Sequence, residues 1–104
     1  MITSSFRPDV LVGKRILITG GGTGLGKELA RHFVAHGASV HICGRREAVL
    51  QGATEELRAV AQHGGSIEYH LCDVREAEQI EAMVERIWAG GPLTGLVNNA
   101  AANF

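Results

Sequence analysis

Four short apolar segments alternate with three longer segments of helical periodicity, and this alternation most constrains how the chain can fold. The first apolar segment is followed at once by glycines, as is typical of a strand buried on both faces of a parallel sheet. Between the apolar segments, hydrophobic residues recur at three- and four-residue intervals, which indicates amphipathic helices. The pattern predicts strands over residues 15–19, 38–43, 67–72 and 93–98, and helices over residues 25–36, 48–62 and a segment that follows Asp73.

The apolar residues of two predicted helices also predict which faces are buried. The helix over residues 25–36 has Leu25, Leu29, Ala30 and Phe33 at helical spacing, and Gly37 stands where a left-handed C-terminal cap is expected. The helix after Asp73 carries a similar stripe, formed by Ile80, Met83, Val84, Ile87 and Trp88.

Strands that alternate with helices of this length imply right-handed crossovers and a parallel sheet. We predict an α/β fold with a doubly wound parallel sheet of the Rossmann type. Residues 1–12 would be a leader, and residues 1–104 the N-terminal part of a single dinucleotide-binding domain. In such a fold the first and fourth strands are neighbours, and the fourth would be an open apolar edge. We therefore interpret the sheet as truncated after its fourth strand, and expect further strands to cover it.

Charge and hydropathy exclude two kinds of partner. Ten basic and eleven acidic residues leave the net charge near zero, so no global field attracts nucleic acid or an anionic membrane. No window approaches 18 consecutive apolar residues, and the N-terminus lacks a signal-peptide pattern, so we expect a cytoplasmic protein. Cys43 and Cys72 are too few and too far apart for a zinc motif or a disulfide scaffold. We expect reduced, buried thiols.

A glycine-rich loop, TGGGTGLG over residues 19–26, joins the first predicted strand to the first predicted helix. The alternative for a glycine cluster is a simple tight turn, but at this junction backbone amides and a helix N-terminus can hold a pyrophosphate. The spacing G-x-G-x-x-G is not met, and the pattern that fits is T-G-x-x-x-G-x-G. The cofactor-binding residues expected in this loop are Gly20, Gly22, Thr23, Gly24, Leu25 and Gly26, with Thr23 and Leu25 as backbone donors.

A nucleotide-hydrolase P-loop is the rival interpretation of the same glycines. Residues 21–27 match G-x-x-x-x-G-K, but the next position needs Ser or Thr to bind magnesium. It is Glu28, whose carboxylate would repel a triphosphate. The sequence therefore favours dinucleotide binding, with Lys27 as a solvated helix charge.

Two arginines follow the second predicted strand, where enzymes that bind a free adenosine ribose usually have Asp or Glu. The sequence there is Cys43-Gly44-Arg45-Arg46, without an acid. Two guanidinium groups can bind a 2′-phosphate through charge-assisted hydrogen bonds. We predict NADP(H) rather than NAD(H), the alternative being two ordinary surface arginines.

Asp73 follows the third predicted strand and so lies at the same carboxyl edge of the sheet. Its carboxylate could accept a hydrogen bond from the adenine amino group, with Val74 flanking the ring. The alternative role for Asp73 is the N-cap of the next helix, and the two roles are compatible.

Three motifs in order resemble the short-chain dehydrogenase/reductase family: residues 19–26, CDV at residues 72–74 and NNAA at residues 98–101. The resemblance covers residues 13–104. It implies that Asn99 and Ala100 lie at the nicotinamide-side ribose, whereas Ala101 replaces the family's glycine. The family's catalytic Ser and Tyr-x-x-x-Lys, or a variant acid, would lie downstream, so no catalytic residue is predicted within this chain, and the 104-residue fragment is expected to be inactive.

Residues 19–27 and 98–104 look most similar to the 2,4-dienoyl-CoA reductase branch, which reduces unsaturated fatty acyl-CoA thioesters with NADPH. This resemblance implies fatty acid metabolism, a small-molecule substrate of acyl-CoA type and, for the full-length form, a homo-oligomer. In that branch Asn103 and Phe104 would lie near the substrate entry. A 3-oxoacyl thioester reductase, an alcohol or ketone reductase, and a stand-alone NADP(H)-binding module are the alternatives.

We expect the remaining candidate site residues to have structural roles. Tyr69 lies within the third predicted strand without a nearby lysine, and we expect it to pack against a helix. The five histidines have no metal-ligand spacing, and no metal is predicted; they are His32, His36, His41, His63 and His70.

Overall fold

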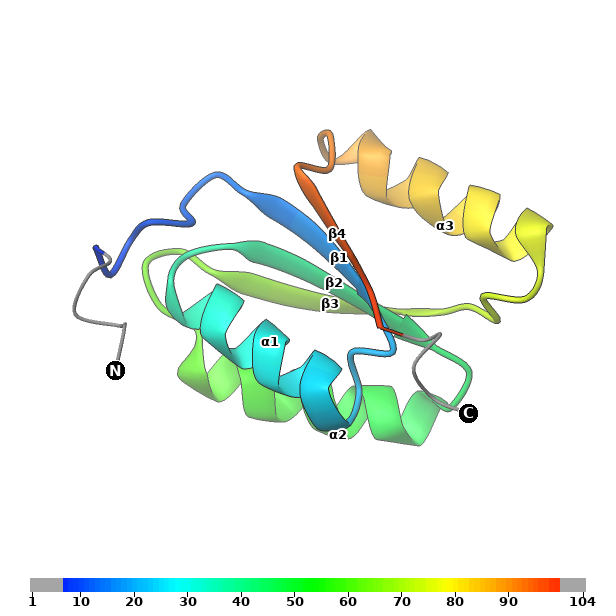
Figure 1. The fold of residues 1–104 in the computed structure, drawn as a ribbon, viewed down its shortest axis with the longest axis horizontal. Coiled ribbons are helices and arrows are strands. Elements are labelled where there is room, and N and C mark those ends of the chain that lie inside the picture. Colours follow the sequence, from blue (N-terminus) through cyan, green and yellow to red (C-terminus); the bar gives the residue numbers. More distant parts are fainter. Residues whose placement is uncertain (1–6, 100–104) are drawn as a thin grey trace.

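A computed structural model describes residues 7–99 as a parallel sheet with helices on both faces (Figure 1). The strands are hydrogen-bonded in the order β3-β2-β1-β4, and every pair is parallel. The predicted doubly wound sheet is confirmed, including the pairing of the first strand with the fourth. In chain order the elements are β1 Arg15–Thr19, α1 Gly24–Ala35, β2 Ser39–Gly44, α2 Glu47–Val60, β3 Ser66–Leu71, α3 Ala77–Ala89 and β4 Gly95–Asn98.

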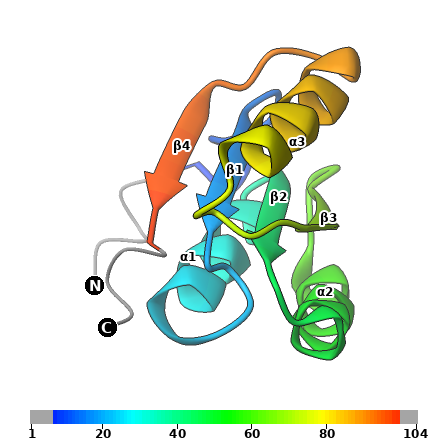
Figure 2. The same ribbon diagram turned by 90° about the vertical axis from the view of Figure 1, so that its right-hand side faces the viewer.

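Different helices cover the two faces of the sheet. Figure 2 shows α1 and α2 on one face and α3 on the other. The larger core lies against α1 and α2 and includes Ile18, Ile42 and Leu57, all fully buried. The smaller core lies against α3 and includes Leu17 and Met83. Because successive strand residues point to opposite faces, β1 supplies both cores and is the centre of the fold.

Two apolar residues that the sequence pattern placed on buried helix faces are exposed, so that prediction was wrong for them. Leu25 is 66% exposed and Trp88 is 53% exposed. Each stands one position away from the residue that faces the sheet, which is Gly26 in α1 and Ile87 in α3. One residue corresponds to about 100° around a helix, enough to turn a side chain to solvent. Within residues 7–99, no helix has the length and apolarity required to cross a membrane.

Gly37 follows the C-terminal end of α1 and lies next to Val12. This glycine has φ +100°, which confirms the predicted left-handed residue after α1. Residues 8–13 form turns, and the Leu11 N–H donates to the His36 carbonyl over 3.0 Å. Leu11 also packs on the larger core. The described part of the leader is therefore docked on the domain.

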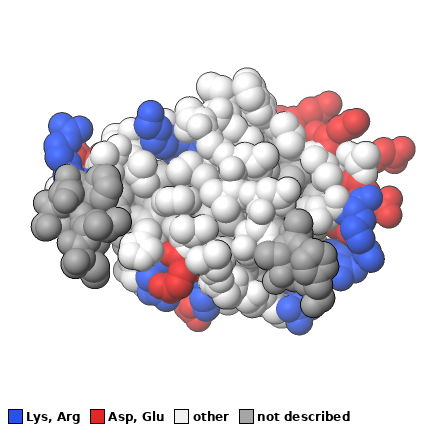
Figure 3. All heavy atoms as spheres, in the orientation of Figure 1, with Lys and Arg blue, Asp and Glu red and all other residues white. Residues whose placement is uncertain are grey.

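The free edge of β4 lies on a weakly charged face of the molecule. Among the described residues β4 pairs only with β1, as predicted for the fourth strand. Leu96 in this strand is 65% exposed. Most of the surface over β4 in Figure 3 is neither acidic nor basic, and the charged groups lie toward its ends.

Candidate functional site

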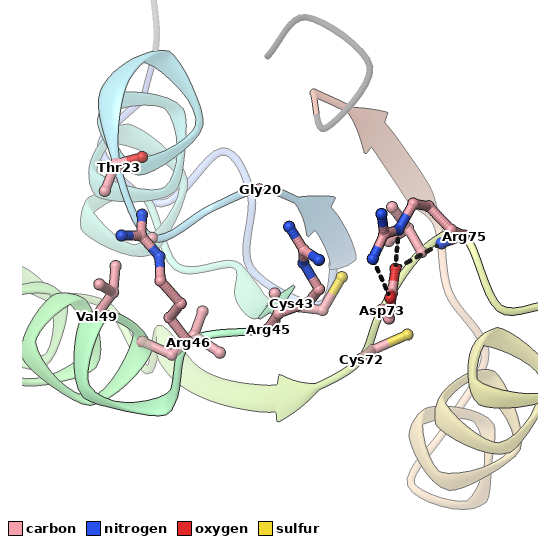
Figure 4. A pocket seen from close by; sticks show the side chains of 13 residues that line it. Gly20, Thr23, Cys43, Arg45, Arg46, Val49, Cys72, Asp73 and Arg75 are labelled. Carbon is pink, nitrogen blue, oxygen red and sulfur yellow. Dashed lines mark hydrogen bonds and ion pairs between the residues drawn. The ribbon is translucent and has the colours of Figure 1, made fainter. Parts of the chain in front are cut away.

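The carboxyl ends of β1, β2 and β3 border a pocket of about 640 Å³ (Figure 4). The elements that line it are the loop after β1, the β2–α2 junction and the β3–α3 loop. This is the crevice that parallel α/β sheets use to bind nucleotides. The lining residues are Gly20, Gly22, Thr23, Cys43, Gly44, Arg45, Arg46, Val49, Leu50, Cys72, Asp73, Val74 and Arg75.

The glycine loop enters the pocket through its first half. Gly20, Gly22 and Thr23 line the pocket, and Gly20 has φ +69°, a conformation that favours glycine. The Gly20 N–H donates to the Cys43 carbonyl over 3.1 Å, which ties the loop to β2. Gly24 has φ +57° and is the first residue of α1. The loop thus leads directly from β1 to a helix N-terminus beside the pocket.

The second half of the loop lies outside the pocket and supports the first half. Gly24 and Leu25 are exposed, whereas Gly26 is buried. A Cβ at Gly26 would collide with the Gly20 carbonyl and stand 2.8 Å from the Asn99 side-chain nitrogen. Gly26 is therefore required for the close approach of α1 to the loop rather than for direct ligand contact.

Asn99 fastens the end of β4 to the same loop. Its backbone N–H donates to Thr19 Oγ1 over 2.9 Å, and its Nδ2 donates to the Gly20 carbonyl over 3.3 Å. Among the described residues it does not line the pocket. Asn99 is thus placed to position the glycine loop. Ala100, the other residue expected at the nicotinamide side, lies outside the described residues, as do Ala101, Asn103 and Phe104.

Arg45 and Arg46 both line the pocket, but their guanidinium groups point to different parts of it. In Figure 4 the Arg46 guanidinium extends toward Thr23, and that of Arg45 lies between Gly20 and Asp73. Both side chains are exposed, and within residues 7–99 neither guanidinium has a hydrogen bond or an ion pair. The charge of Arg45 helps to lower the pKa of Asp73, but no hydrogen bond within residues 7–99 occupies the donors of either guanidinium.

The acidic residue that follows Arg46 in the sequence, Glu47, already accepts a hydrogen bond from another side chain. Glu47 Oε2 accepts a hydrogen bond from the Tyr69 hydroxyl over 3.0 Å, and this hydroxyl also accepts one from Gln51 over 3.2 Å. Tyr69 packs on the larger core, so its predicted structural role is confirmed. Glu47 is absent from the pocket lining, in which Asp73 is the acidic residue.

Asp73 lines the pocket, but its alternative role as the N-cap of the next helix is wrong, because Glu76 occupies that position in α3. Its Oδ1 accepts hydrogen bonds from the backbone N–H and Nε of Arg75, both over 3.0 Å. Its Oδ2 accepts one from Arg75 Nη2 over 2.8 Å. These bonds lower the pKa of Asp73 to about 2. The carboxylate is therefore a fixed acceptor at the carboxyl end of β3.

We expect Asp73 to stay ionised throughout the mildly acidic range. A carboxyl whose folded-state pKa is depressed contributes stability above its ordinary value of 3.8, and that contribution is lost as the pH falls through about 2. Carbon-detected NMR titration of the aspartate carboxyls would check this. Arg75→Gln should raise the Asp73 midpoint only part of the way toward its ordinary value, because the hydrogen bond from the backbone N–H of residue 75 remains. An unchanged midpoint would contradict the pairing of the Asp73 and Arg75 side chains.

The P-loop interpretation is further weakened by the position of Lys27. Its Nζ lies 2.8 Å from Glu56 Oε2 in α2, so the amine is engaged outside the pocket lining. Glu28, at the position that would bind magnesium in a P-loop, pairs instead with Arg31. The sequence alone suggested that Lys27 is a solvated helix charge. In the structure it forms an ion pair with Glu56.

Both cysteines are free and buried, as predicted. Burial is the main cause that raises the pKa of Cys43, to about 11, against an ordinary value of 9.0. At neutral pH its thiolate population is therefore roughly a hundredfold below that of an exposed cysteine. We expect a thiol-specific reagent to label Cys43 in the folded chain far more slowly than in denaturant. Equal labelling rates would contradict its burial.

Several lining residues were not expected from the sequence. Arg75 carries no signal beyond its position after Asp73, and Val49 and Leu50 belong to the apolar pattern of α2. The fold also brings His41 and His70 together across β2 and β3, although the sequence separates them by 29 positions.

Comparisons with known proteins agree with this geometry. The family model described as short chain dehydrogenase matches residues 14–103. A peroxisomal 2,4-dienoyl-CoA reductase from Arabidopsis thaliana is 44% identical over 102 residues, covering 97% of this chain and 33% of the relative. The chain spans about a third of the length of the curated relatives it matches.

Solved structures of short-chain dehydrogenases and reductases also resemble the chain. A short-chain type dehydrogenase/reductase from Mycobacterium ulcerans has a TM-score of 0.83 and 39% identity, covering 86% of this chain and 33% of that protein. A metagenomic short-chain oxidoreductase in complex with NADP has a TM-score of 0.79 and 33% identity, covering 86% of this chain and 40% of that protein.

Proposed function

The chain belongs to the short-chain dehydrogenase family, and from that membership we propose that it is the NADP(H)-binding half of an oxidoreductase. The observation that carries the choice of cofactor is the pair Arg45 and Arg46, which line the pocket at the end of β2 without a hydrogen bond or close ion pair within residues 7–99. A 2′-phosphate would meet two guanidinium groups there, whereas a ribose 2′-hydroxyl would find no acid from the end of β2, and the carboxylate of Asp73 is bonded to Arg75. The related structure that contains NADP supports the same choice.

Each part of the pocket would hold one part of the cofactor. Gly20, Gly22 and Thr23 would contact the pyrophosphate beside the N-terminus of α1, where backbone amides and the helix dipole favour an anion. Asp73 and Val74 would flank the adenine. Gly24, Leu25 and Gly26 would complete the loop, with Gly26 and Asn99 fixing its position. When bound, the cofactor would supply a hydride, and the residues described here would orient it.

The cofactor proposal is tested by two dissociation constants measured on the complete polypeptide. We expect NADPH to bind more tightly than NADH, because only NADPH carries the phosphate that Arg45 and Arg46 would bind. Equal or tighter binding of NADH would overturn the proposal. Titration at two salt concentrations adds a check, since a phosphate contact made by exposed arginines weakens as salt rises.

For the substrate we propose an unsaturated fatty acyl-CoA thioester, reduced as by a 2,4-dienoyl-CoA reductase. The 44% identity to the Arabidopsis reductase supports this choice. The test is NADPH oxidation by the complete polypeptide with a dienoyl-CoA, a 3-oxoacyl-CoA and a simple ketone. Turnover confined to the ketone would overturn the acyl-CoA assignment without affecting the cofactor assignment.

Cellular location and assembly are further parts of the proposal. We propose a cytoplasmic homo-oligomer for the complete protein, although the Arabidopsis relative is named as peroxisomal. Fluorescence microscopy of the tagged complete protein and its mass by light scattering would test the two statements separately.

A further inference from the structure

Three potential metal ligands meet on one face of the sheet, away from the nucleotide pocket. His41 lies in β2, and Glu68 and His70 lie in β3. His41 is in register with Glu68. Residues two apart on a strand share a face, so His70 stands on the same side as Glu68. His41 Nδ1 and His70 Nε2 are 2.9 Å apart, and the ligand atoms of the three residues lie within 4.8 Å of one another.

This cluster occupies the face opposite α1 and α2. The neighbours of His41 in β2, Val40 and Ile42, belong to the larger core, so His41 points to the side of Leu17 and Cys43. None of the three cluster residues lines the nucleotide pocket. A ligand bound here would therefore connect β2 to β3 without occupying the cofactor site.

The two imidazoles lie in a partly buried region of the sheet. Burial is the first cause that lowers the pKa of His41 and of His70. The charges of Arg15 near His41 and Arg86 near His70 act in the same direction, and Glu68 opposes them at both. Burial therefore disfavours the protonated, cationic form of both rings.

We propose that His41, Glu68 and His70 form a binding site for a divalent transition metal of the Zn²⁺ type. Two imidazole nitrogens and one carboxylate oxygen suit Zn²⁺ and its neighbours, whereas Mg²⁺ and Ca²⁺ take mainly oxygen ligands. Tetrahedral coordination at about 2.05 Å separates two nitrogens by about 3.3 Å. The observed 2.9 Å needs only a small opening. The fourth position is left to water.

The site is independent of the proposed cofactor, so its test does not use enzyme activity. Zn²⁺ titration of the full chain by calorimetry should show one equivalent bound with a dissociation constant on the order of 1 µM or tighter. Glu68→Gln and His70→Gln should each weaken Zn²⁺ binding by about 100-fold or more. The loss of a metal ligand costs more affinity than the loss of an outer-shell partner, which costs about 10- to 100-fold. Glu68 is exposed, so its variant leaves the core intact.

Matched controls come from the opposite side of the sheet. His32 in α1 and Glu55 in α2 are exposed, and His32→Gln and Glu55→Gln should bind Zn²⁺ as the parent chain does. Zn²⁺ at about ten times the dissociation constant of the parent should raise the melting temperature of the parent and of both controls, but leave that of Glu68→Gln almost unchanged. Absence of binding, or binding that survives both ligand variants, would overturn the site and leave only a hydrogen bond between the two imidazoles.

Discussion

The double variant Arg45→Ala/Arg46→Ala is expected to bind NADPH about 100-fold or more weakly, while its affinity for NADH changes little. A hydrogen bond to a charged group contributes about 1.5–3 kcal/mol, and about 1.4 kcal/mol corresponds to a tenfold change in affinity. Both guanidinium groups are exposed at the pocket wall and make no hydrogen bond or close ion pair within residues 7–99, so the interaction lost with them is the attraction between Arg45 and Asp73. The loss should therefore appear in cofactor selectivity and not in stability.

The matched control is Lys14→Ala/Arg58→Ala, which removes two exposed positive charges outside the pocket lining. It changes the net charge equally, so it separates a local phosphate contact from a general electrostatic effect. Fluorescence titration with both cofactors would measure all four affinities. If NADPH and NADH lose affinity equally in the arginine variant, the arginines do not bind the 2′-phosphate.

The sequence was sufficient for those parts of the fold that depend on local periodicity. The alternation of strands and helices predicted the sheet order, because a βαβ crossover leaves few ways to place the next strand. Gly37 could be assigned because a left-handed residue after a helix is nearly always glycine. The sequence also predicted that Arg45 and Arg46 lie beside the pocket. They follow β2, and in a parallel sheet the carboxyl ends of the strands border the nucleotide pocket.

What the sequence did not predict depends on packing between distant segments. Leu25 and Trp88 fit an apolar period but turn away from the sheet, and only the placement of α1 and α3 decides this. The role of Gly26 depends on how closely α1 approaches Gly20 and Asn99, residues that meet only when β4 pairs with β1. The approach of His41 to His70 likewise depends on the register of β2 with β3.

Ile18→Ala is expected to destabilise the full chain by about 2–5 kcal/mol, the range for truncating a fully buried aliphatic side chain. Ile18 lies on the central strand, within the core that α1 and α2 cover. Its neighbours Val40, Ile42 and Leu57 are held by other elements, so they cannot easily close the cavity. A domain of this size would lose roughly 10 °C or more in melting temperature.

Leu25→Ala is the control for Ile18→Ala, because Leu25 is exposed in α1 and should change stability by no more than about 0.5 kcal/mol. Urea unfolding would measure both variants. In the folded population the ratio of NADPH to NADH affinity should stay unchanged for Ile18→Ala, because Arg45 and Arg46 remain in place. A loss of selectivity without a loss of stability would mean that the core and the cofactor pocket have been assigned to the wrong residues.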